Sequence, residues 1–253
     1  MGGRRMAGMV ALAAALGLAG AAQAEPGLAN RVYSPYVKNG VDELELRAGR
    51  LNGGPLAGEA SAVVELERGV SDRLSLAMLG EFERHAGEET KLDSVGLEAV
   101  AYLGQIPGIG VDVGGYLEYE QRIHNESGVV EGKLLLAKRA GPAEVLVNLI
   151  AEKALTDRPG EDATAFGYAA QATLEAGRGL RLGGQAFGDL GTRRAFAGRQ
   201  SHYLGPMANW ELHPAWMKGG ELELEAAYLF PAGAERGEAA SQLRLMLEFE
   251  RRF

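Results

Sequence analysis

From about residue 41 onward, the sequence alternates between apolar and polar residues with a period of two, rather than the 3.6 of a helix. In VDELELRAGRL (41–51), for example, Leu44 and Leu46 alternate with Glu43 and Glu45. Such a period predicts β-strands with one apolar and one polar face. About twelve segments follow it, at 41–51, 59–68, 73–84, 94–103, 111–120, 129–138, 143–155, 164–176, 180–187, 202–212, 220–230 and 241–253. The chain is therefore expected to be all-β.

The lengths of the strands and of their connections indicate a barrel. Each segment has about the ten residues that a tilted strand needs to cross a membrane. Short connections such as GRG (177–179) alternate with longer polar ones such as RHAGEETK (84–91), as in outer-membrane barrels with short periplasmic turns and long outer loops. We predict a single antiparallel up-and-down transmembrane β-barrel of about 12 strands over residues 41–253, with both ends periplasmic. A soluble β-barrel or sandwich, with its apolar face inward, shows the same alternation and remains an alternative.

The first 24 residues have the features of a cleaved secretory signal peptide. Arg4 and Arg5 precede an apolar run that is too short to span a bilayer, and Ala22-Gln23-Ala24 has the small-x-small spacing of a cleavage site. The mature chain is then expected to begin at residue 25 and to reach the outer membrane of a Gram-negative bacterium. Residues 25–40 lack the alternation and contain two prolines. They are predicted to be an irregular periplasmic N-terminal segment.

The charge and cysteine content exclude several classes of function. Two of the 26 basic residues lie in the predicted signal peptide. The mature chain then has 24 basic and 34 acidic residues, which gives a net charge of −10. This excess argues against nucleic acid as a partner. The absence of cysteine excludes disulfides and thiolate metal sites. No cofactor is predicted.

The polar face of nearly every predicted strand is rich in glutamate. In a membrane barrel this face lines the interior, where charge of one sign concentrates cations and repels anions. The prediction is a narrow passive pore or transporter with an acidic lumen for small cationic or neutral solutes. A solvated lumen that does not conduct, and an accessory structural barrel of an export system, remain alternatives. The lumen-lining candidates are Glu118, Glu120, Glu144, Glu221, Glu223, Glu225, Arg181, Arg244 and Glu248.

The chain ends in LRLMLEFERRF (243–253), which is an amphipathic strand. The last strand of a barrel has to pair with the first, because an open sheet edge in lipid leaves backbone groups without hydrogen bonds. The stretch resembles the C-terminal assembly signal of bacterial outer-membrane β-barrel proteins, although Arg251 stands where that signal usually has an apolar residue. The resemblance implies the barrel assembly machinery and outer-membrane lipid as partners. The residues that carry it are Leu243, Leu245, Leu247, Phe249 and Phe253.

Two further segments, ELERGVSDRLSLAMLGEFE (65–83) and SHYLGPMANWEL (201–212), resemble the strand–turn–strand phrases of small proteobacterial outer-membrane proteins. That group includes proteins described as transporters and as meta-pathway phenol-degradation outer-membrane proteins. The resemblance implies a fold and a location more than a substrate.

Some twelve-stranded barrels are enzymes, such as outer-membrane phospholipase A and the lipid A deacylases, and an outer-leaflet lipid-modifying hydrolase is a further alternative. The nearest candidate is Ser201-His202, with Asp189 in the preceding connection. Neighbouring residues of a regular strand point to opposite faces, so these two cannot share a catalytic surface, and no catalytic residue is predicted. No metal site is predicted either. His85, His124 and His213 fall in connections, and His124 with Glu126 makes only a weak pair of ligands.

Overall fold

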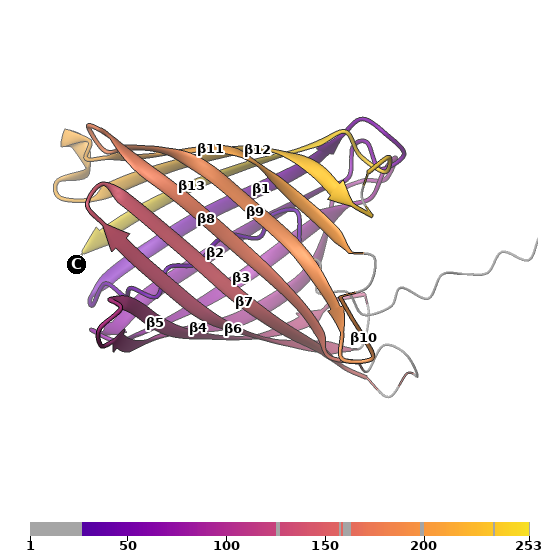
Figure 1. Cartoon of the computed structure of the whole chain (residues 1–253), viewed down its shortest axis with the longest axis horizontal. Coiled ribbons are helices and arrows are strands. Elements are labelled where there is room, and N and C mark those ends of the chain that lie inside the picture. The colour runs from indigo at the N-terminus through magenta and orange to yellow at the C-terminus, as the bar shows by residue number, and fades with distance from the viewer. Residues whose placement is uncertain are drawn as a thin grey trace, which may run out of the picture.

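A computed structural model describes residues 27–124, 127–156, 158, 163–197, 200–234 and 236–252. They form one antiparallel sheet in which neighbouring strands follow each other along the chain (Figure 1). The last strand pairs with the first, from Val41 opposite Arg252 to Asn52 opposite Ser241, so the sheet is closed. The prediction of a twelve-stranded up-and-down barrel is confirmed. Its strands are β1 (Val41–Asn52), β2 (Ala60–Ser71), β3 (Leu74–Arg84), β4 (Lys91–Ile106), β5 (Val111–Arg122), β6 (Gly128–Ala140), β7 (Ala143–Leu155), β8 (Ala165–Gly177), β9 (Leu180–Thr192), β11 (Ser201–Leu212), β12 (Glu221–Gly233) and β13 (Ser241–Arg252).

Two short elements lie outside this ring. β10 (Ala195–Phe196) folds back on the end of β9, and the 3-10 turn η1 (Ala215–Met217) lies between β11 and β12. The connection between the strands predicted at 180–187 and 202–212 is thus shorter than expected, because β9 continues to Thr192. Within the described residues, no helix is long and apolar enough to cross a membrane.

The two ends of the barrel differ in their connections. Residues 41 and 252 lie at one end, which we call the terminus end, together with the connections 72–73, 107–110, 141–142, 178–179 and 213–220. The tightest are two-residue turns. In the turn between β8 and β9, Arg178 and Gly179 both have positive φ, 58° and 74°, which suits the twist of a hairpin. The opposite end, the loop end, carries the connections 53–59, 85–90, 123–127, 156–164, 193–200 and 234–240.

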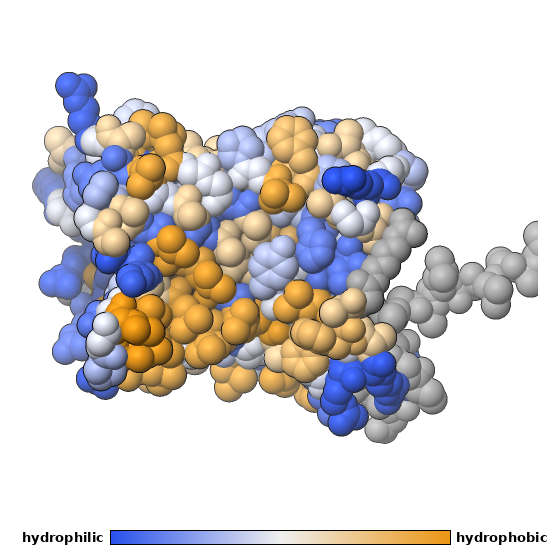
Figure 2. Space-filling view, in the orientation of Figure 1, coloured by the Kyte–Doolittle hydropathy of each residue, from blue (hydrophilic) through white to orange (hydrophobic). Residues whose placement is uncertain are grey.

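Apolar side chains cover the outside of the barrel, and charged ones lie inside it. Leu97 and Leu117 on the outer face expose 62% and 59% of their surface, whereas Glu45 and Glu65 on the inner face expose 1% each. Figure 2 shows apolar side chains gathered on the outer surface between the two ends. A soluble barrel would have the opposite arrangement. The apolar belt is the surface that a lipid bilayer requires, so the soluble alternative is excluded.

The interior is not charged all round. The inner face from β6 to β12 carries a cluster of buried apolar side chains, whereas carboxylates and their cations concentrate from β12 through β1 to β7. The glutamate-rich face predicted for nearly every strand is therefore interrupted by apolar side chains over part of the wall. The apolar cluster consists of Val32, Ala137, Leu146, Ile150, Ala169, Phe187, Met207, Ala227 and Leu229.

One member of this cluster, Val32, comes from residues 27–40, which we call the inner segment. This segment was predicted to be periplasmic, but its side chains lie inside the barrel, where Tyr33 exposes 3% of its surface. It is irregular, as expected, and it begins about halfway along the lumen and ends at the terminus end (Figure 1). Residues 1–26, and with them the predicted signal peptide, lie outside the described residues.

Two inward-facing glycines make room for the inner segment. A Cβ at Gly49 would lie 1.8 Å from the carbonyl oxygen of Leu28, and one at Gly69 would lie 2.0 Å from that of Lys38. Any side chain at these positions would displace the segment. Glycine on the inner face of β1 and β2 thus lets a second backbone pass close to the wall.

Candidate functional site in the barrel lumen

Two rows of four glutamates cross the inner wall in the half of the lumen near the terminus end. The strands β2, β1, β13 and β12 each contribute one residue to each row, and successive members are directly opposite each other in the strand register. Like charges in such positions repel, so the rows need cations to be stable. The first row is Glu65, Glu45, Glu248 and Glu223, and the second is Glu67, Glu43, Glu250 and Glu221.

Arg31 of the inner segment supplies one of these cations. Its guanidinium pairs with Glu45 and lies 3.4 Å from a carboxylate oxygen of Glu43 and 3.7 Å from one of Glu248. Burial opposes the positive charge, but the carboxylates around it outweigh burial and hold the pKa of Arg31 well above its ordinary value. Arg31 therefore contacts both rows at once.

Lys38 has the same role at the mouth of the terminus end. Its Nζ donates to Glu250 at 2.5 Å and lies 3.7 Å from an oxygen of Glu221. Partial burial opposes its charge, but the hydrogen bond to Glu250 and the charges of both carboxylates raise the pKa of Lys38.

A side-chain amide on the opposite wall fixes the middle of the inner segment. The backbone N–H of Tyr33 donates to Oδ1 of Asn148 at 2.7 Å, and Nδ2 of Asn148 donates to the carbonyl oxygen of Tyr33 at 2.9 Å. Asn148 on β7 is completely buried. It satisfies both backbone groups of one residue, as a neighbouring strand would.

The side chain of Tyr33 lies at the centre of a cluster of ionisable groups. Its hydroxyl donates to Glu98 at 3.0 Å and accepts from Arg47 at 2.9 Å. Its ring contacts that of Tyr116, with centroids 4.6 Å apart, and the ammonium of Lys133 lies 4.3 Å and 4.1 Å from the two centroids. Burial raises the pKa of Tyr33 well above its ordinary value. These contacts hold the segment against the charged side of the lumen.

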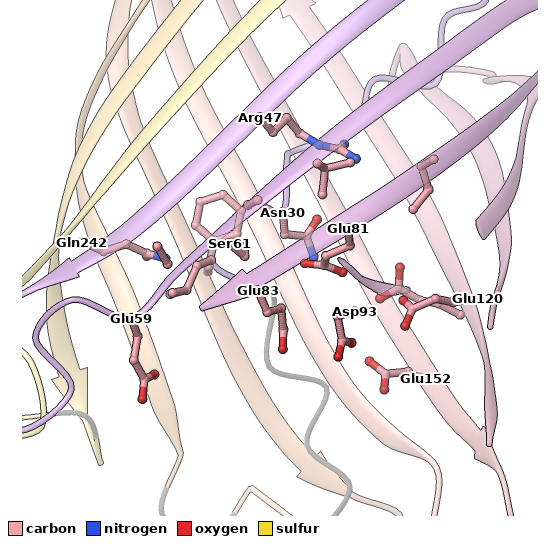
Figure 3. Close-up of a pocket in the computed structure, with 18 of the residues that line it drawn as sticks. Asn30, Arg47, Glu59, Ser61, Glu81, Glu83, Asp93, Glu120, Glu152 and Gln242 are labelled. Carbon is pink, nitrogen blue, oxygen red and sulfur yellow. The ribbon is translucent and has the colours of Figure 1, made fainter. Parts of the chain in front are cut away.

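Between the inner segment and the loop end lies a cavity of about 430 Å³. Its curved wall from β3 to β7 is acidic, and Figure 3 shows carboxylates pointing into it. The rest of the lining includes Ser61 and Gln242 beside apolar residues, together with Arg47 and Glu59. The carboxylates include Glu81, Glu83, Asp93, Glu118, Glu120 and Glu152.

All nine predicted lumen residues occupy inward-facing positions, but they do not form one site. Glu118 and Glu120 line the cavity, whereas Glu221, Glu223 and Glu248 belong to the glutamate rows. The remaining four lie in separate contacts. Glu144 pairs with Arg139 and lies 3.8 Å from Arg181, Glu225 accepts from Gln185 at 2.6 Å, and Arg244 donates to the backbone of the inner segment while stacking on Phe187.

Sequence reasoning missed the residues that hold the inner segment, above all Arg31 and Asn148. A lone arginine and a lone asparagine carry no local signal. The inward-facing glycines were a signal that could have been used, because Gly49 and Gly69 stand in strands where a side chain would otherwise fill the lumen.

The residues considered for catalysis lie apart. Ser201 lines the cavity, whereas His202, the next residue of β11, contacts Tyr168, with Nδ1 3.2 Å from the tyrosine hydroxyl. Asp189 accepts from the backbone of Gly191 at 2.6 Å. The two neighbours Ser201 and His202 thus face different environments, as the strand period requires.

Among the described residues, three groups of carboxylates and histidine have the spacing of metal ligands. The group at Glu43, Glu45 and Glu248 already surrounds the guanidinium of Arg31. A second group is Glu65, Glu67 and Glu98, and the third is Glu211, His213 and Glu221 at the terminus end. Glu126, the partner considered for His124, lies outside the described residues.

No protein-family model and no curated protein matches this sequence significantly. Solved structures do match. The chain is similar to the COG4313 outer-membrane channel from Pseudomonas putida F1, with a TM-score of 0.57 and 15% identity over 86% of this chain and 97% of that one. It has the fold of an outer-membrane porin. The NanC porin gives a TM-score of 0.56 at 8% identity, covering 83% and 100% of the two chains. A KdgM porin in complex with disordered oligogalacturonate gives 0.52 at 9%, covering 83% and 99%.

Proposed function

We propose that this protein is an outer-membrane channel for small cationic or neutral solutes, and that the inner segment restricts its lumen. The observation that carries the proposal is the pair of glutamate rows on the inner wall of a closed barrel with an apolar exterior. Eight carboxylates facing one lumen attract cations and repel anions.

The proposed location rests on the outer surface and on the last strand. Leu243 and Leu245 of β13 face outward and expose 37% and 50% of their surface, in the position that the assembly signal needs for contact with lipid. Phe253 lies outside the described residues. The terminus end, with its short turns, would face the periplasm. Outer-membrane lipid and the barrel assembly machinery would be the partners during insertion. The likeness to meta-pathway phenol-degradation proteins stays a prediction.

The inner segment gives the channel a closed state. It contacts the wall on the charged side through Arg31 and on the apolar side through Val32, so it occupies the middle of the lumen. Passage of a solute then requires the segment to shift. When it does, Arg31 and Lys38 leave the glutamate rows, and the carboxylates become available to cations that pass.

Current recordings in planar bilayers, with a salt gradient across the membrane, test this proposal. The reversal potential is expected to show cation selectivity, which falls when Glu221, Glu223 and Glu225 are replaced by Gln. The control is Glu88→Gln with Glu89→Gln, which removes two carboxylates from the exposed connection after β3 and should leave the selectivity unchanged. A wild-type protein that carries no current at any voltage, or that selects for anions, would overturn the proposal.

A further inference from the structure

The acidic cavity at the loop end has the features of a binding site. Its volume of about 430 Å³ lies within the range of small-molecule sites, about 300–1,000 Å³. It opens on the side of the inner segment that faces the loop end, because Glu59, His85 and Ser201 line it. In the proposed orientation, a ligand would reach it from outside the cell without any movement of the inner segment.

The cavity has more carboxylates than its own cations neutralise. Lys133 pairs with Glu131 at 2.9 Å, and Nε of Arg122 lies 3.6 Å from Glu120. The other two lining arginines are engaged elsewhere, since Arg47 pairs with Glu45 and Glu65 outside the cavity and Arg84 donates to the carbonyl oxygen of Gly58. Among the described residues, Glu81 on β3 and Glu152 on β7 make no ion pair and no side-chain hydrogen bond. A half-buried carboxylate without an ion pair or hydrogen bond costs free energy unless a cation or water satisfies it.

Two neutral side chains of the cavity also lack partners. The hydroxyl of Ser61 and Oε1 of Gln242 are buried and form no hydrogen bond within the described residues. Ser61 exposes 6% of its surface and Gln242 exposes 1%, and both line the cavity on the side away from β7 (Figure 3). Each can accept a hydrogen bond. The cavity therefore presents acceptors on two sides, the carboxylates of the wall from β3 to β7 and the neutral oxygens of Ser61 and Gln242.

The spacing of these acceptors favours an organic cation over a metal ion. The three groups of described residues with the spacing of metal ligands all lie outside the acidic wall of the cavity. Its free carboxylates, Glu81 and Glu152, come from strands with three others between them. Apolar side chains, among them Val63, Leu79 and Phe187, complete the lining and can contact methylene groups.

We propose that this cavity binds a small linear organic polycation, with separate amines on the free carboxylates and its aliphatic chain on the apolar lining. The inference deepens the proposed channel function and rests on it for the role of the ligand as a transported solute. Binding itself can be measured without transport.

Isothermal titration calorimetry on the full chain in nonionic detergent tests the proposal, with the linear triamine spermidine as the probe. Spermidine is expected to bind near one equivalent, at least about tenfold more tightly than butylamine or Mg²⁺, because several charge-assisted hydrogen bonds form at once. The double variant Glu81→Gln/Glu152→Gln should weaken binding at least about tenfold. Ser61→Ala should weaken it by a smaller factor.

The control variant is Glu88→Gln/Glu89→Gln, which removes the same charge at the same end of the barrel outside the cavity. It should change the affinity less than twofold. Each variant is checked for the compact electrophoretic mobility of an unheated barrel. Absence of spermidine binding, equal affinity for Mg²⁺, or an equal effect of the control variant would overturn the proposal. Binding without bilayer current would keep this site and overturn the channel, whereas current without binding would do the reverse.

Discussion

Replacement of Asn148 by Ala is expected to release the inner segment and open the channel. The change removes two buried hydrogen bonds, of 2.7 Å and 2.9 Å, that join β7 to the backbone of Tyr33. It leaves the N–H and C=O of Tyr33 without partners in a residue that exposes 3% of its surface. In the displaced segment these two groups can bond to water instead, so the substitution weakens only the seated state.

The size of the effect follows from the two groups left without partners. Each unsatisfied buried group costs about 1–3 kcal/mol, so the seated state loses roughly 2–3 kcal/mol if both groups stay without partners and each costs a value in the lower half of that range. Since about 1.4 kcal/mol corresponds to a factor of ten, the ratio of displaced to seated segment should rise roughly 30- to 150-fold.

Two measurements report this ratio. The open probability in single-channel recordings should rise in Asn148→Ala. The chain has no cysteine, so a single Ser34→Cys substitution gives a site whose alkylation rate by a water-soluble maleimide should rise in parallel.

The matched control is Gln171→Ala, which removes an inward-facing amide on β8 that accepts from Gln185 and has no hydrogen bond to the inner segment. If Asn148→Ala changed neither the open probability nor the alkylation rate, or if the control changed them equally, the amide would not be what holds the segment.

Three further outcomes are expected. Leu97→Arg places a charge on the lipid-facing side of β4, where Leu97 exposes 62% of its surface. It should lower the free energy of unfolding by about 2–4 kcal/mol. Urea titration in vesicles measures this change, with Leu97→Ile as the control. Arg31→Met should lower the unfolding temperature markedly, because it leaves buried carboxylates without a cation. Arg31→Lys keeps the positive charge and should lower it much less. Burial and the hydrogen bond to Asp112 raise the pKa of Tyr36 to about 12. This bond stabilises the fold fully below about pH 10, the ordinary tyrosine pKa, and its contribution is lost as the pH rises through 12. The phenolate absorbance that Tyr36→Phe removes should therefore appear near pH 12, and its appearance near pH 10 would contradict the reasoning.

The sequence predicted the barrel well because a strand that separates lipid from a polar interior has to alternate. Leu44 and Leu46 face outward and Glu43 and Glu45 inward, as their positions required. The terminal strand could be recognised for the same reason, since its pairing with β1 follows from the need to remove the sheet edge in lipid.

The contents of the lumen could not be predicted in the same way. The pairing of Tyr33 with Asn148 joins residues 115 positions apart, and no periodicity relates an irregular segment to a strand so distant. One stretch of the sequence does indicate the apolar half of the wall. In AEVLVNLIAEKAL (143–155), Leu146 and Ile150 face inward on either side of Asn148, while Val145 and Leu149 face outward. Apolar residues on both faces of a strand are typical of one that is buried on both. That observation indicates that something apolar fills the lumen, but it does not identify the inner segment.

The position of Arg31 has a consequence for how the barrel is made. β1 and β13 are the first and last strands to be synthesised, and along the seam between them Glu45 faces Glu248 and Glu43 faces Glu250. The two edges that must meet last during insertion thus repel each other. The inner segment precedes β1 directly and brings Arg31 to three of these four carboxylates and Lys38 to the fourth. We therefore expect the inner segment to be enclosed as β1 and β13 pair, with Arg31 and Lys38 offsetting the repulsion between the two strand edges.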